Sequence, residues 1–161
     1  MRPAEVRVLL RSALAVVATT VAGISWAQGA SWQTACDNGQ CRLGQAYLVD
    51  GALVSRVLIQ KIDATEIVEI RLPLGMSQLA KIVAEVDGEQ QFDIRVAVCR
   101  ADGCVGILPN PAAAIAAFKR GRELKLKFLG FDDGKVYFYP FDLDGFTAAY
   151  TEYSTASAQG Q

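Results

Sequence analysis

The chain has 161 residues, with 16 Lys and Arg against 17 Asp and Glu, and 52% of its residues are hydrophobic. This composition predicts one globular domain and excludes a disordered or strongly charged chain. The charge balance gives no support for nucleic acid as a partner. Because the sequence contains no His, it excludes Ser-His-Asp and Cys-His catalysis as well as zinc or haem sites that need histidine ligands.

Residues 1–27 have the three parts of a secretory signal peptide. The segment begins with three arginines, Arg2, Arg7 and Arg11. They precede an uncharged, mostly apolar run over residues 12–24. Ser25-Trp26-Ala27 then offers a small-x-small cleavage pattern. The apolar run is shorter than the ~20 residues that span a membrane. We therefore expect cleavage after Ala27 and an exported mature domain, 28–161, without a transmembrane span.

The four cysteines form two pairs with the same C-x4-C spacing, Cys36 with Cys41 and Cys99 with Cys104. Each pair encloses an Asn-Gly or Asp-Gly dipeptide, which supplies the positive φ of a tight hairpin turn. Cysteines that flank such a turn face each other, and export places them in an oxidising compartment. We expect two local disulfides. A four-cysteine zinc site and a redox-active pair are the alternatives, but both usually use C-x2-C spacing.

Most of the mature chain alternates between apolar and polar residues, which is the pattern of half-buried strands. Asp-Gly turn signals separate several of these runs. One alternating run, from Gln91 to Val98, is expected to form a single strand. The predicted strands, about eight in number, cover residues 42–49, 52–60, 67–72, 81–86, 91–98, 104–108, 123–128 and 136–141, and the run 52–60 is apolar enough to lie centrally. This pattern predicts an all-β sandwich or barrel.

Two short helices interrupt the strands. Asn110 suits an N-cap and Pro111 suits the first helical position, so we expect an Ala-rich helix to Lys119. Near the end of the chain, Asp144 is expected to cap a helix over 145–153. The small, polar residues 154–161 are expected to form a disordered tail.

An ordered set of segments extends from Trp32 to Tyr150. Trp32 precedes the first Cys pair, and Leu72-Pro73-Leu74-Gly75-Met76 follows a strand in mid-chain. The second Cys pair runs into the Ala-rich helix, which ends in Lys119-Arg120-Gly121, and Gly145-Phe146-Thr147-Ala148-Ala149 closes the order. In order and spacing this set resembles the invasion-associated locus B family of bacterial exported proteins. The resemblance implies one immunoglobulin-like β-sandwich, in the periplasm or at the outer cell surface, and an association with host-cell invasion. It supplies no catalytic residues.

A basic segment is the first candidate site. It contains five positive residues opposed only by Glu123, namely Lys119, Arg120, Arg122, Lys125 and Lys127. Such a patch is suited to anionic lipid, an acidic glycan or an acidic protein. The alternative is a solvated strand face whose lysines protect an edge from pairing.

An aromatic run from Val136 to Phe141 is the second candidate. If Phe138 points inward, Tyr137 and Tyr139 point outward and are suited to an interface. The alternative is packing beneath the C-terminal helix. The segment that follows, Asp142-Leu143-Asp144-Gly145, resembles the start of a calcium loop but lacks the distal Glu, so we expect a turn and a helix cap there, with no metal.

The sequence contains no nucleotide-binding loop and no nucleophile motif. We therefore expect a non-catalytic binding or envelope-interaction module without a cofactor, whose partner is a protein or another envelope component. A small periplasmic hydrolase that uses carboxylates and a thiol-disulfide protein are the two alternative functions.

Overall fold

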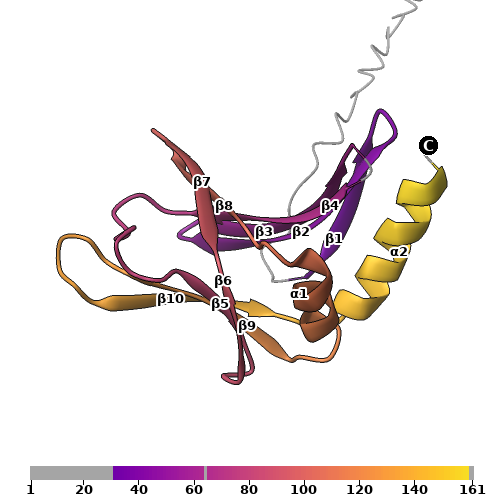
Figure 1. Cartoon of the computed structure of the whole chain (residues 1–161). Helices are drawn as coiled ribbons and strands as arrows, with labels where there is room; N and C mark the ends of the chain where they lie inside the picture. The colour runs from indigo at the N-terminus through magenta and orange to yellow at the C-terminus, as the bar shows by residue number, and fades with distance from the viewer. Residues whose placement is uncertain (1–30, 64, 160–161) are drawn as a thin grey trace, which may run out of the picture.

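Two antiparallel sheets face each other in the computed structural model, and two helices close one side of the sandwich (Figure 1). The structure describes residues 31–63 and 65–159, so the predicted signal peptide lies outside the described residues. The six-stranded sheet contains, in spatial order, β1 (Gln33–Asp37), β2 (Gln40–Val49), β3 (Ala52–Ile62), β4 (Thr65–Leu72), β8 (Gly103–Ile107) and β7 (Arg95–Arg100). The four-stranded sheet contains β10 (Val136–Asp142), β9 (Glu123–Leu129), β5 (Val83–Val86) and β6 (Gln90–Asp93).

The all-β sandwich is confirmed, with ten strands where about eight were expected. One additional strand is β1, which is short and carries no run of alternating apolar residues. The other arises because the expected strand over 91–98 is two strands, β6 and β7, in different sheets. The chain changes sheet at Ile94, whose backbone N–H donates to the carbonyl of Ile82 at 2.8 Å. Alternation continues through this crossing, because Phe92, Ile94 and Val96 all point into the same core.

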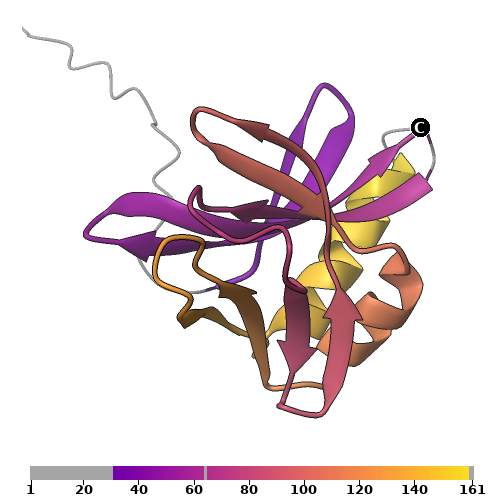
Figure 2. The ribbon, with the colours of Figure 1, turned by 60° about the vertical axis from the view of Figure 1, so that its left-hand side comes forward.

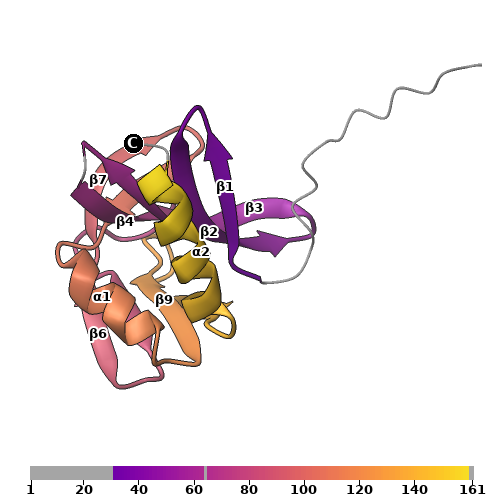
Figure 3. The same cartoon turned by 90° about the vertical axis from the view of Figure 1, so that its right-hand side faces the viewer.

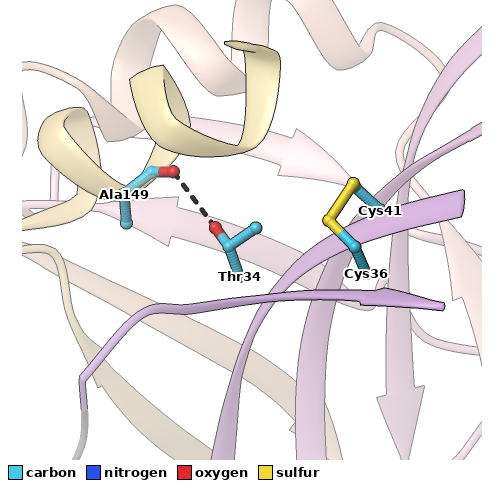
Figure 4. The surroundings of a disulfide bond; sticks show 4 residues. All are labelled: Thr34, Cys36, Cys41 and Ala149. Carbon is cyan, nitrogen blue, oxygen red and sulfur yellow. Dashed lines mark hydrogen bonds between the residues drawn. A yellow bond between two sulfur atoms is a disulfide. The ribbon is translucent and has the colours of Figure 1, made fainter. Parts of the chain in front are cut away.

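Tight hairpins explain the disulfides. Asn38 and Gly39 have φ values of 49° and 78°, so Cys36 and Cys41 become direct cross-strand partners. Both expected disulfides, Cys36–Cys41 and Cys99–Cys104, are confirmed. Figure 4 shows the first, beside the hydrogen bond from Thr34 Oγ1 to the Ala149 carbonyl.

The second hairpin differs from the prediction in its turn. Arg100 pairs with Gly103, so the central turn residues are Ala101 and Asp102 rather than Asp102 and Gly103. Gly103 has a φ of 136°, and a Cβ there would lie 2.8 Å from the Leu72 carbonyl oxygen. The two hairpins form opposite edges of the same sheet, because β1 and β7 are its outermost strands. Each disulfide therefore fastens one edge strand to its neighbour.

Helix α1 (Pro111–Phe118) begins as predicted: the Asn110 side chain accepts a hydrogen bond from the Ala113 backbone N–H at 3.3 Å. Helix α2 (Phe146–Gln159) is longer than predicted, so the disordered tail from residue 154 is wrong for the described residues. Ser157 is buried, and three hydroxyls of α2 donate to carbonyls one turn earlier, namely those of Thr151, Ser154 and Thr155. These bonds satisfy polar side chains that otherwise favour turns over helices.

Helix α2 packs against β1 and β2, with α1 beside it (Figure 3). The indole of Trp32 connects the N-terminal segment to the start of α2 and the end of β10. Its ring packs edge to face on Phe146, with centroids 4.7 Å apart, and its N–H donates a hydrogen bond to the Asp142 carbonyl at 2.7 Å. Asp142 also forms the turn before α2, where its carboxylate accepts the backbone N–H of Asp144 at 2.8 Å. The turn-forming side chain is thus Asp142, which precedes the predicted cap at Asp144.

Candidate functional site

The predicted basic segment does not form one free cationic patch. Lys125 and Lys127 lie on the outer face of β9, as alternation predicts, but each is half-buried and paired with an acidic side chain. The Nζ atom of Lys125 lies 2.6 Å from Glu123, and that of Lys127 contacts Glu85. Lys119 lies over the ring of Tyr150, 3.9 Å from its centroid. Of the five residues, only the side chains of Arg120 and Arg122 are exposed and make no ion pair or ring contact in the described part of the chain, although the charge of Arg122 helps to lower the pKa of Asp87.

Glu85 was not singled out from the sequence, although it determines the environment of Lys127. It is only 5% exposed and also accepts a hydrogen bond from Gln91 at 2.7 Å. The hydrogen bond from Lys127, followed by that from Gln91, lowers the pKa of the Glu85 carboxyl. Glu85 and Lys127 therefore form an ion pair on the outer face of the four-stranded sheet. This pair links β5 to β9 and leaves Lys127 without a free charge for a partner.

The predicted orientation of the aromatic strand is wrong. Tyr137 and Tyr139 lie opposite Phe128 and Leu126 of β9, on the face that points into the sandwich, while Phe138 points outward. Tyr139 stacks on Tyr47 of the other sheet, so it packs between the two sheets. Both phases of this strand are apolar, so periodicity could not distinguish its inner face from its outer face.

Exposed apolar side chains gather where the β4–β5 and β9–β10 loops meet. Five side chains here are between 42% and 68% exposed, and together they define what we call the loop end: Leu74, Phe131, Val136, Tyr137 and Phe138. The two loops are joined by backbone hydrogen bonds from Phe131 to Gly75 at 2.8 Å and from Ser77 to Leu129 at 2.7 Å. Figure 2 shows both loops on the side of the molecule away from the helices. These hydrogen bonds therefore hold the two loops, and the exposed apolar side chains that they carry, in a fixed arrangement.

The loop end contains an open depression of about 360 Å³. Its lining includes Pro73 and Leu74 from one loop, and Asp132 and Asp133 from the other. Four aromatic rings, those of Phe128, Phe131, Tyr137 and Tyr139, complete the apolar part of the lining. The depression therefore combines aromatic and aliphatic side chains with two acidic residues.

A hydrogen-bond network fixes the shape of the β9–β10 loop. The Tyr137 hydroxyl donates to Asp133 Oδ2 at 2.7 Å, and the Lys135 backbone N–H donates to Asp133 Oδ1 at 3.1 Å. The bond from Tyr137 lowers the pKa of the Asp133 carboxyl and raises the pKa of the Tyr137 hydroxyl. Gly130 permits this arrangement, because a Cβ there would lie 2.4 Å from Asp133 Oδ1 and 2.9 Å from Tyr137 Cε2.

The cysteines bind no metal, because all four are joined in disulfides, and this excludes the four-cysteine zinc alternative. Within residues 31–63 and 65–159, no group of three or more His, Cys, Asp or Glu side chains is placed to hold a metal ion. The same part of the chain contains no helix that is long and apolar enough to cross a membrane.

Comparisons with known proteins agree with the resemblance found in the sequence. Residues 28–154 match the model of the family described as "Invasion associated locus B (IalB) protein". The crystal structure of invasion associated protein b from Bartonella henselae superposes with a TM-score of 0.67 at 18% sequence identity, over 77% of this chain and 92% of that one. At that identity the likeness shows a shared fold. No curated protein sequence matches the chain. Because the family model spans most of the chain, the protein belongs to the invasion associated locus B family.

Proposed function

We propose that the protein is an exported, non-catalytic binding module of the bacterial envelope that engages a protein partner through the loop end. The observation that carries this proposal is the gathering of five exposed apolar side chains at the loop end, three of which, Leu74, Phe131 and Tyr137, line one depression. Exposed apolar patches on soluble domains mark interaction sites, and Tyr and Phe are enriched in protein interfaces. Both the family and the similar Bartonella protein are named for invasion, so we propose that this contact contributes to host-cell invasion.

The charge of the loop end favours a protein over an anionic membrane. Asp132 and Asp133 lie beside the apolar side chains, and the hydrogen bond from Tyr137 lowers the pKa of the Asp133 carboxyl, which favours its charged form. Lys135 offsets one of these charges, because its Nζ lies 3.8 Å from Asp133 Oδ2, and the remaining excess of carboxylate disfavours the phosphates of an anionic lipid surface. The depression is instead suited to an apolar side chain of a partner, with a basic or hydrogen-bond-donating group beside it.

The pKa directions support a binding role over carboxylate-based hydrolysis. A glycosidase-type pair needs one carboxylic acid whose pKa is raised, so that it can donate a proton. In the depression, the pKa of Asp133 is lowered by its hydrogen bonds from Tyr137 and Lys135. The carboxyl pKa values of Glu85, Asp87 and Asp102 are also lowered. These groups are suited to accept hydrogen bonds and ion pairs, and are poorly suited to act as general acids.

The position of the disulfides supports a structural role over thiol-disulfide exchange. Each bridge closes a hairpin at an edge of the six-stranded sheet, where it prevents the outer strand from separating. Neither pair begins a helix, where the dipole would activate a thiolate.

Host-cell invasion by bacteria that lack the gene and carry a plasmid copy would test the proposal. We expect Phe131→Ser to reduce invasion to the level of the deletion strain, because it removes the most exposed aromatic ring of the loop end. Glu152→Ser is the control, since it shortens an exposed polar side chain on α2, away from the loop end. Full invasion by the Phe131 variant, at normal protein levels, would reject the loop end as the contact surface.

A further inference from the structure

The outer face of the six-stranded sheet forms a second surface, separate from the loop end. Val68 and Ile70 of β4 are fully buried in the core, so Glu69 and Arg71 between and after them point to the opposite side. Helix α2 packs on the core side, where Thr34 of β1 meets the Ala149 carbonyl. Among the described residues, no helix or strand covers the outer face (Figures 1 and 3).

Strand register brings five arginines to this face. Arg56 of β3 is the direct partner of Arg71, and Arg42 of β2 lies on the same side because its partner, Gln60, is four residues from Arg56. Arg95 of β7 pairs with Ile107, which in turn pairs with Glu69. We call these side chains, together with that of Arg100 at the end of β7, the arginine face: Arg42, Arg56, Arg71, Arg95 and Arg100.

The positively charged residues of this face are arginines and not lysines. The described residues contain seven arginines, and the two outside the arginine face are Arg120 and Arg122. None of the lysines that the structure describes lies on it. Lys61 of β3 is the cross-strand partner of Glu66, whose carboxylate accepts a hydrogen bond from Tyr150 of α2 on the core side. Arginine offers a planar fork of donors that binds carboxylates in a bidentate manner, which lysine cannot do.

The positive charge on the face is only partly neutralised from within the chain. Arg71 pairs with Asp102 at 2.9 Å, and Arg56 lies 3.6 Å from Glu69. Arg42, Arg95 and Arg100 are exposed and make no ion pair in the described part of the chain. Like charges placed directly opposite each other, as Arg56 and Arg71 are, disfavour the isolated sheet. An external anionic partner would relieve this repulsion.

The remaining side chains favour a protein as that partner. Exposed aliphatic residues lie among the arginines, including Val98 and Ile107, whereas no Trp, Tyr or Phe of the described residues lies on the face. Protein interfaces are enriched in Arg and depleted of Lys. Membrane-binding surfaces instead combine Lys and Arg with interfacial aromatic residues. We propose that the arginine face binds an acidic polypeptide segment, whose closely spaced Asp and Glu carboxylates pair with the arginine forks.

The test compares binding of the mature, disulfide-bonded protein to two probes at ~0.05 M salt, where screening is weak. Poly-L-glutamate presents carboxylates on a polypeptide, and phosphatidylglycerol vesicles present phosphates on a membrane. We expect poly-L-glutamate to bind the wild type, and Arg42→Gln with Arg95→Gln to weaken that binding about tenfold. Because these two arginines are exposed and make no ion pair in the described part of the chain, their replacement breaks no ion pair there.

The matched control is Arg120→Gln with Arg122→Gln, which removes the same charge from exposed arginines elsewhere. We expect it to change the affinity less than about twofold. Equal loss in both double variants would show that net charge alone governs binding, and would overturn the proposal. Absence of poly-L-glutamate binding would also overturn it, as would Arg42- and Arg95-dependent binding to the vesicles alone. Phe131→Ser should leave poly-L-glutamate binding intact, so failure here is distinct from failure of the loop end.

Discussion

The ring of Tyr47 stacks on the ring of Tyr139, with centroids 5.0 Å apart and an interplanar angle of 26°. Tyr47 belongs to β2 of the six-stranded sheet and Tyr139 to β10 of the four-stranded sheet, so this contact joins the two layers. Tyr139 also packs against Phe128 at 5.3 Å, and both line the depression. The rings of Tyr139 and Phe128, which line the depression, are therefore also part of the contact between the sheets.

Removing one ring of this pair should destabilise the whole domain. We expect Tyr47→Ala to lower the free energy of unfolding by about 2 kcal/mol, because it leaves a cavity between the sheets and removes an aromatic stack. Urea unfolding followed by fluorescence measures the change. Phe138→Ala is the control, since Phe138 lies on the outward face of β10. It should change the free energy by less than about 0.5 kcal/mol. Equal losses in the two variants would contradict the observed orientation of β10.

Gly130 should tolerate no side chain. Gly130→Ala places a Cβ 2.4 Å from Asp133 Oδ1, so we expect the Tyr137–Asp133 hydrogen bond to break and the β9–β10 loop to rearrange. Near-ultraviolet circular dichroism of the tyrosines and binding of the partner should both change. Gly134→Asn in the same loop is the control, because Gly134 has a φ of 62°, which Asn accepts, and open space around it. A Gly130→Ala protein with an unchanged tyrosine spectrum would disprove the close packing described here.

Glu85 should contribute stability that depends on pH. Its pKa is lowered from an ordinary value of 4.5, chiefly by Lys127, so the folded state favours the ionised carboxylate. This contribution is present above about pH 4.5 and is lost as the pH falls through the lower pKa of the folded state. At pH 7, Glu85→Gln should lower the free energy of unfolding by about 1.5 kcal/mol. Thermal unfolding of both proteins between pH 7 and pH 3 should show this difference shrinking. A difference that stays constant over that range would contradict the ion pair.

The two disulfides should contribute independently. Cys36→Ser with Cys41→Ser should lower the free energy of unfolding by about 2 kcal/mol and leave the fold intact, because the bridge closes a very short loop. Cys99→Ser with Cys104→Ser should behave in the same way. The effects should add, since the bridges lie at opposite edges of the sheet. Peptide mapping that joins Cys36 to Cys99 or Cys104 would contradict the local pairing.

The sequence predicted those features that depend on interactions between neighbouring residues, such as turns and helix starts. Asn38-Gly39 determined a hairpin turn and thereby a disulfide, and Asn110 with Pro111 determined the start of α1. The charge pattern of 119–127 gave no sign that Lys127 is neutralised by Glu85, because that partner lies 42 residues away. The function of a charged side chain depends on such long-range contacts.

The apolar and polar alternation cannot identify the buried face of a strand when both of its faces carry apolar residues. In β10, Tyr137, Phe138 and Tyr139 are all aromatic, and only the pairing with Phe128 and Leu126 of β9 distinguishes the inner face. The arginine face was missed for a related reason. Its members lie on four strands, and only the register of the sheet places them together.

Site-specific photocrosslinking in intact bacteria tests the central claim most directly. A photoreactive amino acid replaces Phe131 at the loop end, and in a separate strain it replaces Glu152, which is exposed on α2. We predict one discrete crosslinked protein from position 131, lost when Tyr137→Ser is added, and no such product from position 152. The same product from both positions, or none from position 131 while position 152 gives one, would contradict the assignment of the loop end as the partner-binding surface.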